Sequence, residues 1–157
     1  MSEYKTVSDS YSEQVQILTQ ANINGYNRLF GGQLMEWIDI VAAVTARRHS
    51  GRNVTTAVVD TLTFEAPAYP NDTIIVCGHI TYVGRTSMEV CVKSYVENLD
   101  GTRKIINTAY LVMVALDENE HPVEVPRLKI STEEEQAEWS AAEKRAALRK
   151  QRRAEKY

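Results

Sequence analysis

The chain has 157 residues, of which 43% are hydrophobic and 25% are charged, and its formal net charge is −3. This length suits a single domain that can bury a hydrophobic core. The small negative charge gives no reason to expect nucleic acid as a partner, and no apolar run approaches the roughly 18 residues that a membrane span needs. Residues 1–14 lack the basic and then apolar pattern of a secretion signal, so the sequence predicts a cytoplasmic protein.

The first third of the chain predicts one long helix. Residues 7–18 could form a short strand or an extended lead-in, and the Asn- and Gly-rich segment 21–32 is typical of a loop. From Phe30 to about Ser50, residues for one helix face recur at the required spacing, namely Leu34, Ile38, Val41 and Thr45. Basic residues then occupy the last turn, where cations suit the helix dipole, and Gly51 can end the helix.

The segment after this helix predicts β-structure. Four stretches rich in β-branched residues are separated by turn signals: residues 53–64, 73–83, 86–97 and 104–116. The turns "VGRT" and "NLDGT" join neighbouring stretches as hairpins, which makes the sheet mostly antiparallel. A single sheet with one apolar face would wrap the long helix, so the sequence predicts an α+β domain.

Cys77 and Cys91 lie in the two strands that "VGRT" joins, and they follow no metal-ligand spacing. A register that matches apolar with apolar residues sets Cys77 opposite Cys91 and His79 beside Glu89. A cross-strand disulfide is then conceivable, but a reducing cytosol favours two free thiols.

Residues 131–157 predict a charged helical tail that follows a domain of residues 1–130. Two capping boxes could start this helix, Ser131 with Glu134 or Thr132 with Glu135. Acidic residues come first and basic residues last, as the helix dipole favours. Because the apolar residues are mostly Ala, a peripheral helix that frays is favoured over a basic binding tail.

Asp39 is a charge within the otherwise apolar part of the long helix. On a helical wheel its neighbours are mostly small: Gly32, Met35, Ala43 and Ala46. Small neighbours leave space in front of the carboxylate, as a ligand pocket requires. An aspartate at the edge of the solvated side, or one paired with an arginine, fits this spacing equally well.

Gly31 and Gly32 lie at the start of the same helix. The unpaired N–H groups of a first turn suit an oxyanion or a carbonyl oxygen, and glycine lets a substrate approach the backbone closely. Glycine also occurs near helix starts for backbone reasons alone. Gly32 and Asp39 are ~10 Å apart along the helix axis, so one scissile carbonyl cannot contact both in one helix. A joint role requires the helix of a second chain, packed antiparallel.

Four segments resemble the hotdog-fold acyl-CoA thioesterases: "NGYNRLFGGQLMEWID", "VTTAVVDTLTFEAPAYPND", "TYVGRTSMEV" and "VPR". The resemblance extends from about Gln16 to Leu128. Within this family, the chain is most similar to bacterial acyl-CoA thioesterases and to animal cytosolic acyl-CoA hydrolases. It implies a hotdog fold, in which an antiparallel sheet wraps a central helix, and dimers that often assemble into hexamers as trimers of dimers. It also implies hydrolysis of acyl-CoA to a free acid and CoA, without a metal or an organic cofactor.

The resemblance further implies roles for particular residues. Asp39 would act as a general base or as a nucleophile. The amide of Gly32, with Gly31 beside it, would polarise the thioester carbonyl. Asn24 or Asn27 would make polar contacts from the opposite subunit, and the spacing of the loop leaves the choice between them open.

Two further parts of the site follow from the same resemblance. Thr56, early in the first long strand, would line the catalytic site. The hairpin of Gly84, Arg85, Thr86 and Ser87 would contact the phosphates of CoA, and Arg85 would be the phosphate partner.

The proposed chemistry needs little machinery, because thiolate is a good leaving group and a carboxylate with an oxyanion donor can suffice. We expect structural or solvent-exposed positions for all three histidines, His49, His79 and His121. Two other functions compete with the hydrolase. A non-catalytic module would bind acyl-CoA without turnover, and a hotdog dehydratase would need a histidine paired with Asp or Glu in the site.

Overall fold

A computed structural model describes residues 3–157 of the chain. Its elements, in chain order, are β1 (Tyr4–Thr6), α1 (Val7–Ser10), β2 (Ser12–Ile17), the 3-10 turn η1 (Gln20–Asn22), α2 (Gly31–Ser50), β3 (Asn53–Phe64), β4 (Thr73–Val83), β5 (Ser87–Glu97), β6 (Arg103–Leu116), β7 (Arg127–Lys129) and α3 (Glu133–Glu155). Within residues 3–157, no helix combines the length and the apolar character that crossing a bilayer requires.

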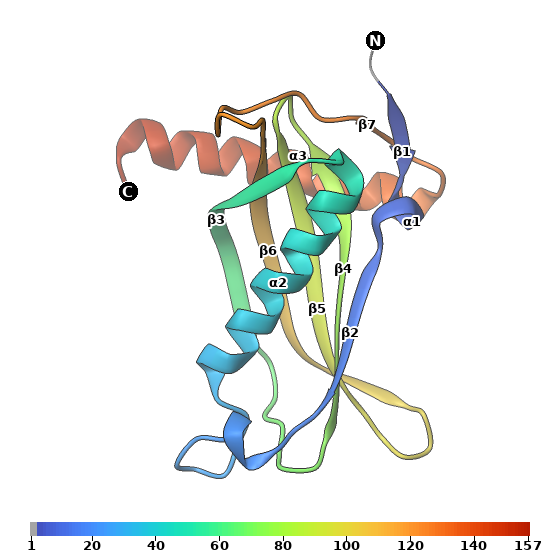
Figure 1. Cartoon of the computed structure of the whole chain (residues 1–157), viewed down its shortest axis with the longest axis vertical. Helices are drawn as coiled ribbons and strands as arrows, with labels where there is room; N and C mark the ends of the chain where they lie inside the picture. The colour runs from blue at the N-terminus through green and yellow to red at the C-terminus, as the bar shows by residue number, and fades with distance from the viewer. Residues whose placement is uncertain (1–2) are drawn as a thin grey trace.

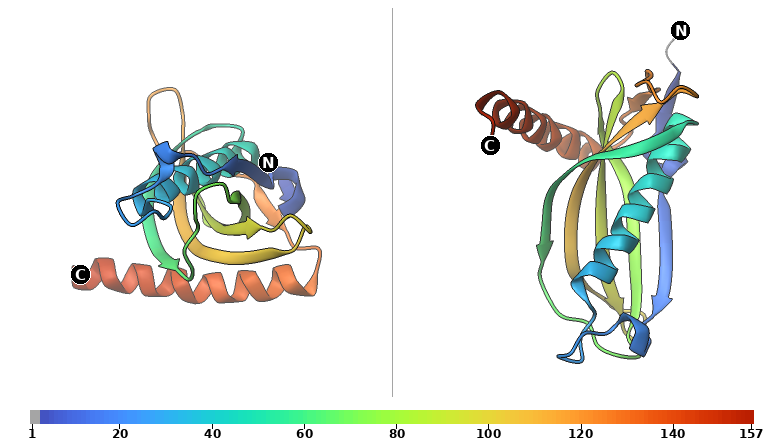
Figure 2. Two further views of the ribbon diagram at one scale, coloured as in Figure 1. Left: turned by 90° about the horizontal axis from the view of Figure 1, so that it is seen from below. Right: turned by 60° about the vertical axis from the view of Figure 1, so that its left-hand side comes forward.

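The main sheet is antiparallel, with the strand order β2-β4-β5-β6-β3, and it curves around α2. Figure 1 shows α2 crossing the concave face of this sheet, and Figure 2 shows α3 on the outer, convex face. The core fills the space between α2 and the sheet, where fully buried side chains include Leu34, Ile38, Ile80, Met88 and Leu111. The apolar stripe of the helix thus meets the inward-facing residues of the strands.

The predicted α+β hotdog architecture is confirmed. α2 begins at Gly31 and ends at Ser50, and β3 to β6 agree with the four predicted strands to within one residue. The sheet has five strands instead of the expected four, because part of segment 7–18 forms β2 at its edge. β1 and β7 form a separate parallel pair.

Two glycines fit α2 to its surroundings. Gly51 adopts a left-handed conformation with φ 67° and donates its N–H to the Arg47 carbonyl, so it ends the helix as expected. Gly78 of β4 lies directly under α2, where an added Cβ would come within 2.8 Å of Thr45 Oγ1 and 3.0 Å of Val41 Cγ1. A larger residue at position 78 would therefore push the helix off the sheet.

The expected register between β4 and β5 is wrong by two residues. Cys77 pairs with Lys93 and Cys91 pairs with His79, and both cysteines are free thiols. A two-residue slip keeps every side chain on its own face of the sheet, so apolar matching alone cannot distinguish the two registers. Burial raises the pKa of the Cys91 thiol to about 12.

The expected contact between His79 and Glu89 is also wrong. His79 Nε2 contacts the carboxylate of Glu138 in α3 instead. Glu89 is completely buried and accepts hydrogen bonds from Arg145 and Arg149 of the same helix. Both partners come from residues more than 50 positions away, so no local pattern could have identified them.

α3 is the expected C-terminal helix, and it lies on the outside of the sheet (Figure 2). Of the two possible caps, Thr132 accepts the N–H of Glu135 at 3.0 Å, and the helix then continues to Glu155. Its contacts with the sheet include Trp139, whose ring lies 4.4 Å from that of Tyr82. The tail is therefore packed on the convex face of the sheet (Figure 2).

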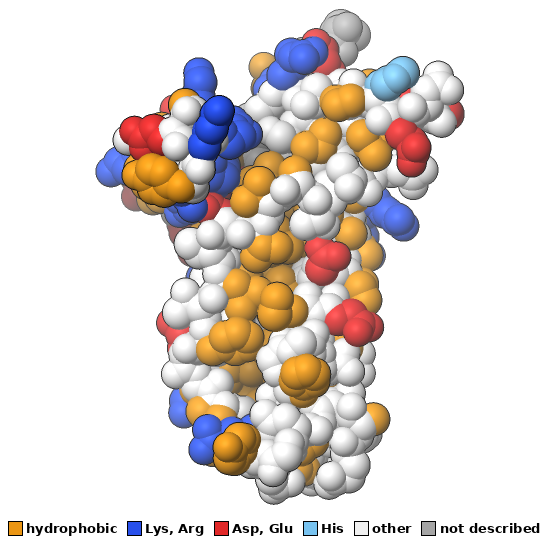
Figure 3. Space-filling view, turned by 90° about the vertical axis from the view of Figure 1, so that its left-hand side faces the viewer, with side chains coloured by type: hydrophobic (Ala, Val, Ile, Leu, Met, Phe, Trp, Pro, Cys, Tyr) orange, Lys and Arg blue, Asp and Glu red, His pale blue; other side chains and the backbone are white. Residues whose placement is uncertain are grey.

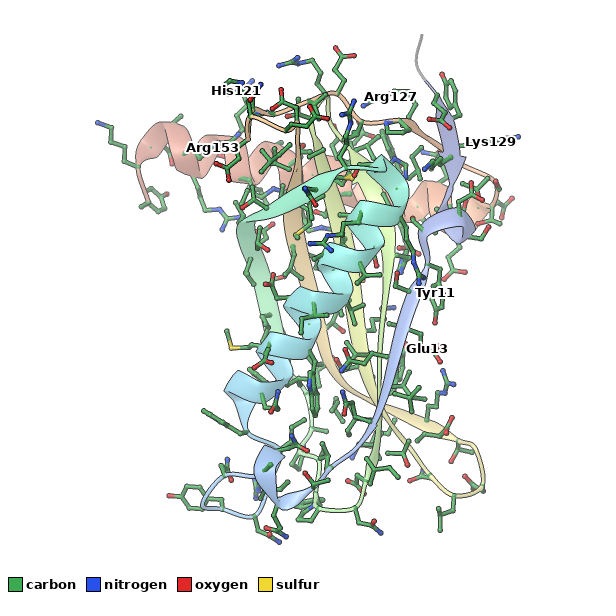
Figure 4. The ribbon with its side chains drawn as sticks, viewed as in Figure 1. Tyr11, Glu13, His121, Arg127, Lys129 and Arg153 are labelled. Carbon is green, nitrogen blue, oxygen red and sulfur yellow. The ribbon has the colours of Figure 1, made fainter. Side chains whose placement is uncertain are left out.

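His49 is the buried histidine of the structure and ties α2 to the segment before β7. Its ring is fully buried, and Nε2 donates to the Pro126 carbonyl at 2.8 Å. Nδ1 has no hydrogen-bond partner among the described residues. Desolvation lowers the pKa of His49, because a buried imidazolium would lose its hydration. By contrast, the side chain of His121 is 75% exposed and lies in the loop after β6 (Figure 4).

The burial of His49 predicts acid sensitivity. Below about pH 6.5, the ordinary pKa of histidine, His49 takes up a proton in the unfolded chain but not in the folded chain. The free energy of unfolding therefore falls as the pH is lowered. Because one proton is involved, the loss is at most ~1.4 kcal/mol per pH unit. Urea unfolding of wild type and His49→Gln at pH 7.5 and 5.5 measures this loss, which the variant should lack. The exposed His121→Gln is the control, and an equal pH dependence in His49→Gln and wild type would contradict the prediction.

Candidate active site

Asp39 and Thr56 lie together at the exposed side of α2. The Thr56 hydroxyl donates a hydrogen bond of 2.6 Å to Asp39 Oδ1. The two residues are 17 positions apart, in α2 and β3, and only the packing of the strand beside the helix brings them into contact. This bond fixes the carboxylate, while Oδ2 accepts no hydrogen bond from the described residues and can face a ligand or water.

A cavity of about 370 Å³ adjoins this pair, between α2 and β3. Gly32, Met35 and Asp39 line its helix side, whereas Thr56, Val59 and Leu62 line its strand side. The space that the small neighbours of Asp39 predict is therefore present. Apart from the carboxylates, the lining is largely apolar, which suits the acyl part of a ligand better than a charged group.

Gly31 and Gly32 form the first turn of α2. The carbonyl of Phe30 accepts the N–H groups of Gln33 and Leu34 at 3.0 and 3.2 Å, and no side chain caps the helix start. Within the described chain, this leaves the amides of Gly31 and Gly32 without an acceptor. Both amides are thus available to bind a carbonyl oxygen, with the helix dipole in their favour.

Asn24 and Asn27 lie in the exposed loop that precedes α2, and they differ in what holds them. Asn27 has φ 59°, a left-handed position that asparagine tolerates, so a backbone reason explains it. Asn24 Oδ1 accepts the N–H of Tyr26 at 2.9 Å, which leaves its amide group free to donate. Asn24 also lines a hollow of about 410 Å³ together with Gly31, which places it at the same end of α2.

The predicted CoA hairpin lies at the opposite end of the molecule. Figure 1 shows the start of α2 at one end of the sheet and the β4–β5 hairpin at the other. Gly84 and Arg85 line a hollow of about 670 Å³ beside this hairpin. Thr86 and Ser87 do not line it, and their carbonyls instead accept the N–H groups of Ala115 and Gly84.

Sequence reasoning missed several residues of this hollow. Trp139 of α3 and Tyr4 of β1 contribute aromatic walls, and Arg127 donates to the Gly84 carbonyl at 2.6 Å, which fixes the hairpin. Arg127 was visible only within the quoted "VPR" motif, and Trp139 and Tyr4 carry no local signal for this position. Figure 4 shows Arg127 at the hairpin end of the molecule.

Metal ligation has no candidate in residues 3–157, where no group of three or more His, Cys, Asp and Glu side chains converges. A curved antiparallel sheet wrapped around a long helix, with a carboxylate and free first-turn amides on that helix, defines the class of hotdog-fold thioesterases.

Comparisons with known proteins agree with this class. Residues 26–101 match the Thioesterase superfamily. The acyl-CoA thioester hydrolase YkhA of Bacillus subtilis is 43% identical over 131 residues, which cover 83% of this chain and 76% of that protein. An acyl-CoA hydrolase of Staphylococcus aureus, solved with butyryl-CoA and CoA, has a TM-score of 0.92 and 31% identity over 98% of this chain and 94% of its own. A hexameric acyl-CoA thioesterase has a TM-score of 0.93 and 35% identity over 97% of this chain and 98% of its own. The chain therefore belongs to the acyl-CoA thioester hydrolases of the thioesterase superfamily.

Proposed function

We propose that the chain hydrolyses acyl-CoA in a site that two subunits share. Asp39 and Thr56 of one subunit supply the base, and the first-turn amide of Gly32 in the other subunit binds the thioester oxygen. Asn24, beside that first turn, donates a further hydrogen bond to the substrate. The observation that carries the proposal is the hydrogen bond between Thr56 and Asp39 next to an open, largely apolar cavity.

The proposed reaction begins with a water molecule that Asp39 holds through its free oxygen. Asp39 takes a proton from this water as the water oxygen attacks the thioester carbonyl carbon. Negative charge develops on the carbonyl oxygen, where the amide of Gly32 stabilises it. The intermediate then collapses, the carbon–sulfur bond breaks, and the CoA thiolate that leaves takes the proton held by Asp39, which restores the base.

Substituted forms of the S. aureus hydrolase support the choice of residues. That protein has been solved with alanine in place of an asparagine, an aspartate and a threonine, separated by 15 and 17 residues. The same intervals separate Asn24, Asp39 and Thr56 here. This spacing favours Asn24 over Asn27 as the substrate contact.

Two observations support a shared site. Gly32 and Asp39 are ~10 Å apart along α2, too far for one carbonyl to contact both. β3 is an edge strand, and large apolar side chains on it, on α2 and at the N-cap of α2 are exposed: Phe30, Met35, Ile40, Val59 and Phe64. Figure 3 shows an apolar band interrupted by acidic side chains on this side of the molecule. Such a face suits a second copy of the chain, and neighbours of this fold are hexameric. We propose a dimer through this face and a trimer of such dimers.

The test is complementation between two inactive variants. Asp39→Asn removes the base, and Gly32→Pro removes the amide donor without breaking a hydrogen bond inside α2, because the Gly32 N–H has no acceptor in the described chain. Each variant alone should release almost no CoA thiol from acyl-CoA. When the two chains are coexpressed, each mixed dimer keeps one intact site, so about a quarter of wild-type activity should return if chains pair at random.

Other outcomes would decide against parts of this proposal. No recovery in verified mixed dimers would place Asp39 and Gly32 of one site in the same chain. Wild-type protein that binds acyl-CoA but releases no CoA would favour the non-catalytic module. Single turnover in H₂¹⁸O tests the nucleophile role of Asp39, because ¹⁸O in the Asp39 carboxylate requires a covalent mixed anhydride that water opens at Asp39, whereas ¹⁸O in the free acid alone fits both roles.

A further inference from the structure

β3 contains two bulges that change which of its residues face the active site. Thr56 pairs with Met113, but the next paired residue is Val58, so Ala57 is an extra residue. A second irregularity follows between Val59 and Thr61, which makes Asp60 an extra residue as well. Regular alternation would place every second residue beside the cavity. Here the cavity-lining residues of β3 are spaced by three: Thr56, Val59 and Leu62.

Asp60, the extra residue of the second bulge, is held from the other side of the sheet. Its side chain is only 2% exposed, and each carboxylate oxygen accepts a hydrogen bond from α3, Oδ2 from Arg149 at 2.9 Å and Oδ1 from Arg152 at 2.6 Å. Burial alone would raise the pKa of Asp60, but the hydrogen bonds from Arg152 and Arg149 lower it, so the carboxylate is charged at neutral pH.

Arg149 connects this anchor to the centre of the sheet. Its guanidinium also donates to Glu89 Oε2 at 2.8 Å, and Arg145 holds the same carboxylate. Glu89 lies in β5, two strands away from β3, so α3 bridges the stable middle of the sheet to its edge. Because β3 is an edge strand, its bulges have only one neighbouring strand within the chain. Arg149 and Arg152 supply the restraint that a second neighbouring strand would give.

We infer that Asp60 is a positioning residue for hydrolysis, which acts by fixing the β3 bulges so that Thr56 points at Asp39. Loss of either bulge would shift the strand by one residue and turn Thr56 to the other face of the sheet. The inference rests on the proposed role of Thr56 and Asp39. It assigns to α3 a function in catalysis although this helix lies on the face of the sheet opposite α2 (Figure 2).

The test compares Arg152→Gln with the matched control Arg153→Gln. Arg152 is 45% exposed and holds Asp60, whereas the side chain of its exposed neighbour Arg153 makes no hydrogen bond or ion pair with residues 3–157. Both variants should fold, because the side chains reach solvent. Arg152→Gln should lower kcat for acyl-CoA several-fold with little change in KM. Arg153→Gln should retain the wild-type kcat.

Asp60→Asn gives the larger effect and leaves Arg149 paired with Glu89. A misplacement of about 1 Å at a reacting group can cost 10²-fold in rate, so kcat should fall by ten- to a hundredfold. In a Thr56→Val background the same substitution should change kcat less than twofold, since the residue through which it acts is gone.

Two results would overturn the inference. One is equal kcat for Arg152→Gln and Arg153→Gln, which remains decisive if Asp60→Asn does not fold. The other is an equal loss from Asp60→Asn with and without Thr56, because a merely structural role gives additive effects. A fully active Asp39→Asn would instead refute the proposed function, so the two failures are distinguishable.

Discussion

Asp39→Asn should reduce kcat for acyl-CoA hydrolysis by about 10²–10⁴-fold, the usual contribution of a positioned general base. The asparagine has nearly the same shape and can still accept the hydrogen bond that Thr56 now donates. It cannot take a proton from water, so binding of acyl-CoA should persist while turnover is lost. Release of free CoA thiol measures turnover, and isothermal titration with a thioester analogue measures binding.

Asp100→Asn is the control for this experiment. Asp100 lies in the β5–β6 hairpin and binds only Thr102, so the same chemical change there should leave kcat unaltered. A folded Asp39→Asn protein that hydrolyses acyl-CoA at the wild-type rate would remove Asp39 from the mechanism. A rate loss accompanied by an equal loss of binding would assign Asp39 to substrate binding instead.

Glu89→Ala should lower the free energy of unfolding by about 3–5 kcal/mol, because breaking a buried ion pair leaves a charge without a partner. The Glu89 carboxylate is 0% exposed and accepts hydrogen bonds from Thr81, Arg145 and Arg149. Arg149 would keep Asp60, but Arg145, only 20% exposed, would lose its acceptor beside the Tyr110 ring. Urea unfolding monitored by circular dichroism measures the change.

Glu143→Ala makes the same chemical change at an exposed position of α3, and we expect it to alter stability by no more than ~0.5 kcal/mol. If Glu89→Ala lost no more than this control, the ion pairs under α3 would be shown to contribute little. α3 would then be held mainly by apolar contacts such as that of Trp139 with Tyr82.

The main elements of the fold were predictable because local patterns encode them. The helix of Gly31–Ser50 follows from apolar spacing and the Gly51 stop, and the four long strands follow from β-branched stretches between turns. The β4–β5 register was not predictable, because a two-residue slip leaves each face unchanged. The partners of His79 and Glu89 were missed because they come from α3, more than 50 residues away.

For the active site, the sequence by itself determined which residue types stand on the long helix, a glycine pair at its start and Asp39 two turns later. The ~10 Å between them follows from helix geometry, and a joint role in one reaction would require a second chain. Only the tertiary structure decided that Thr56 donates a hydrogen bond to Asp39 and that every third residue of β3, from Thr56 to Leu62, lines the cavity. The physical reason is that bulges and buried ion pairs depend on contacts between distant segments, whereas helix spacing is set within a few neighbouring residues.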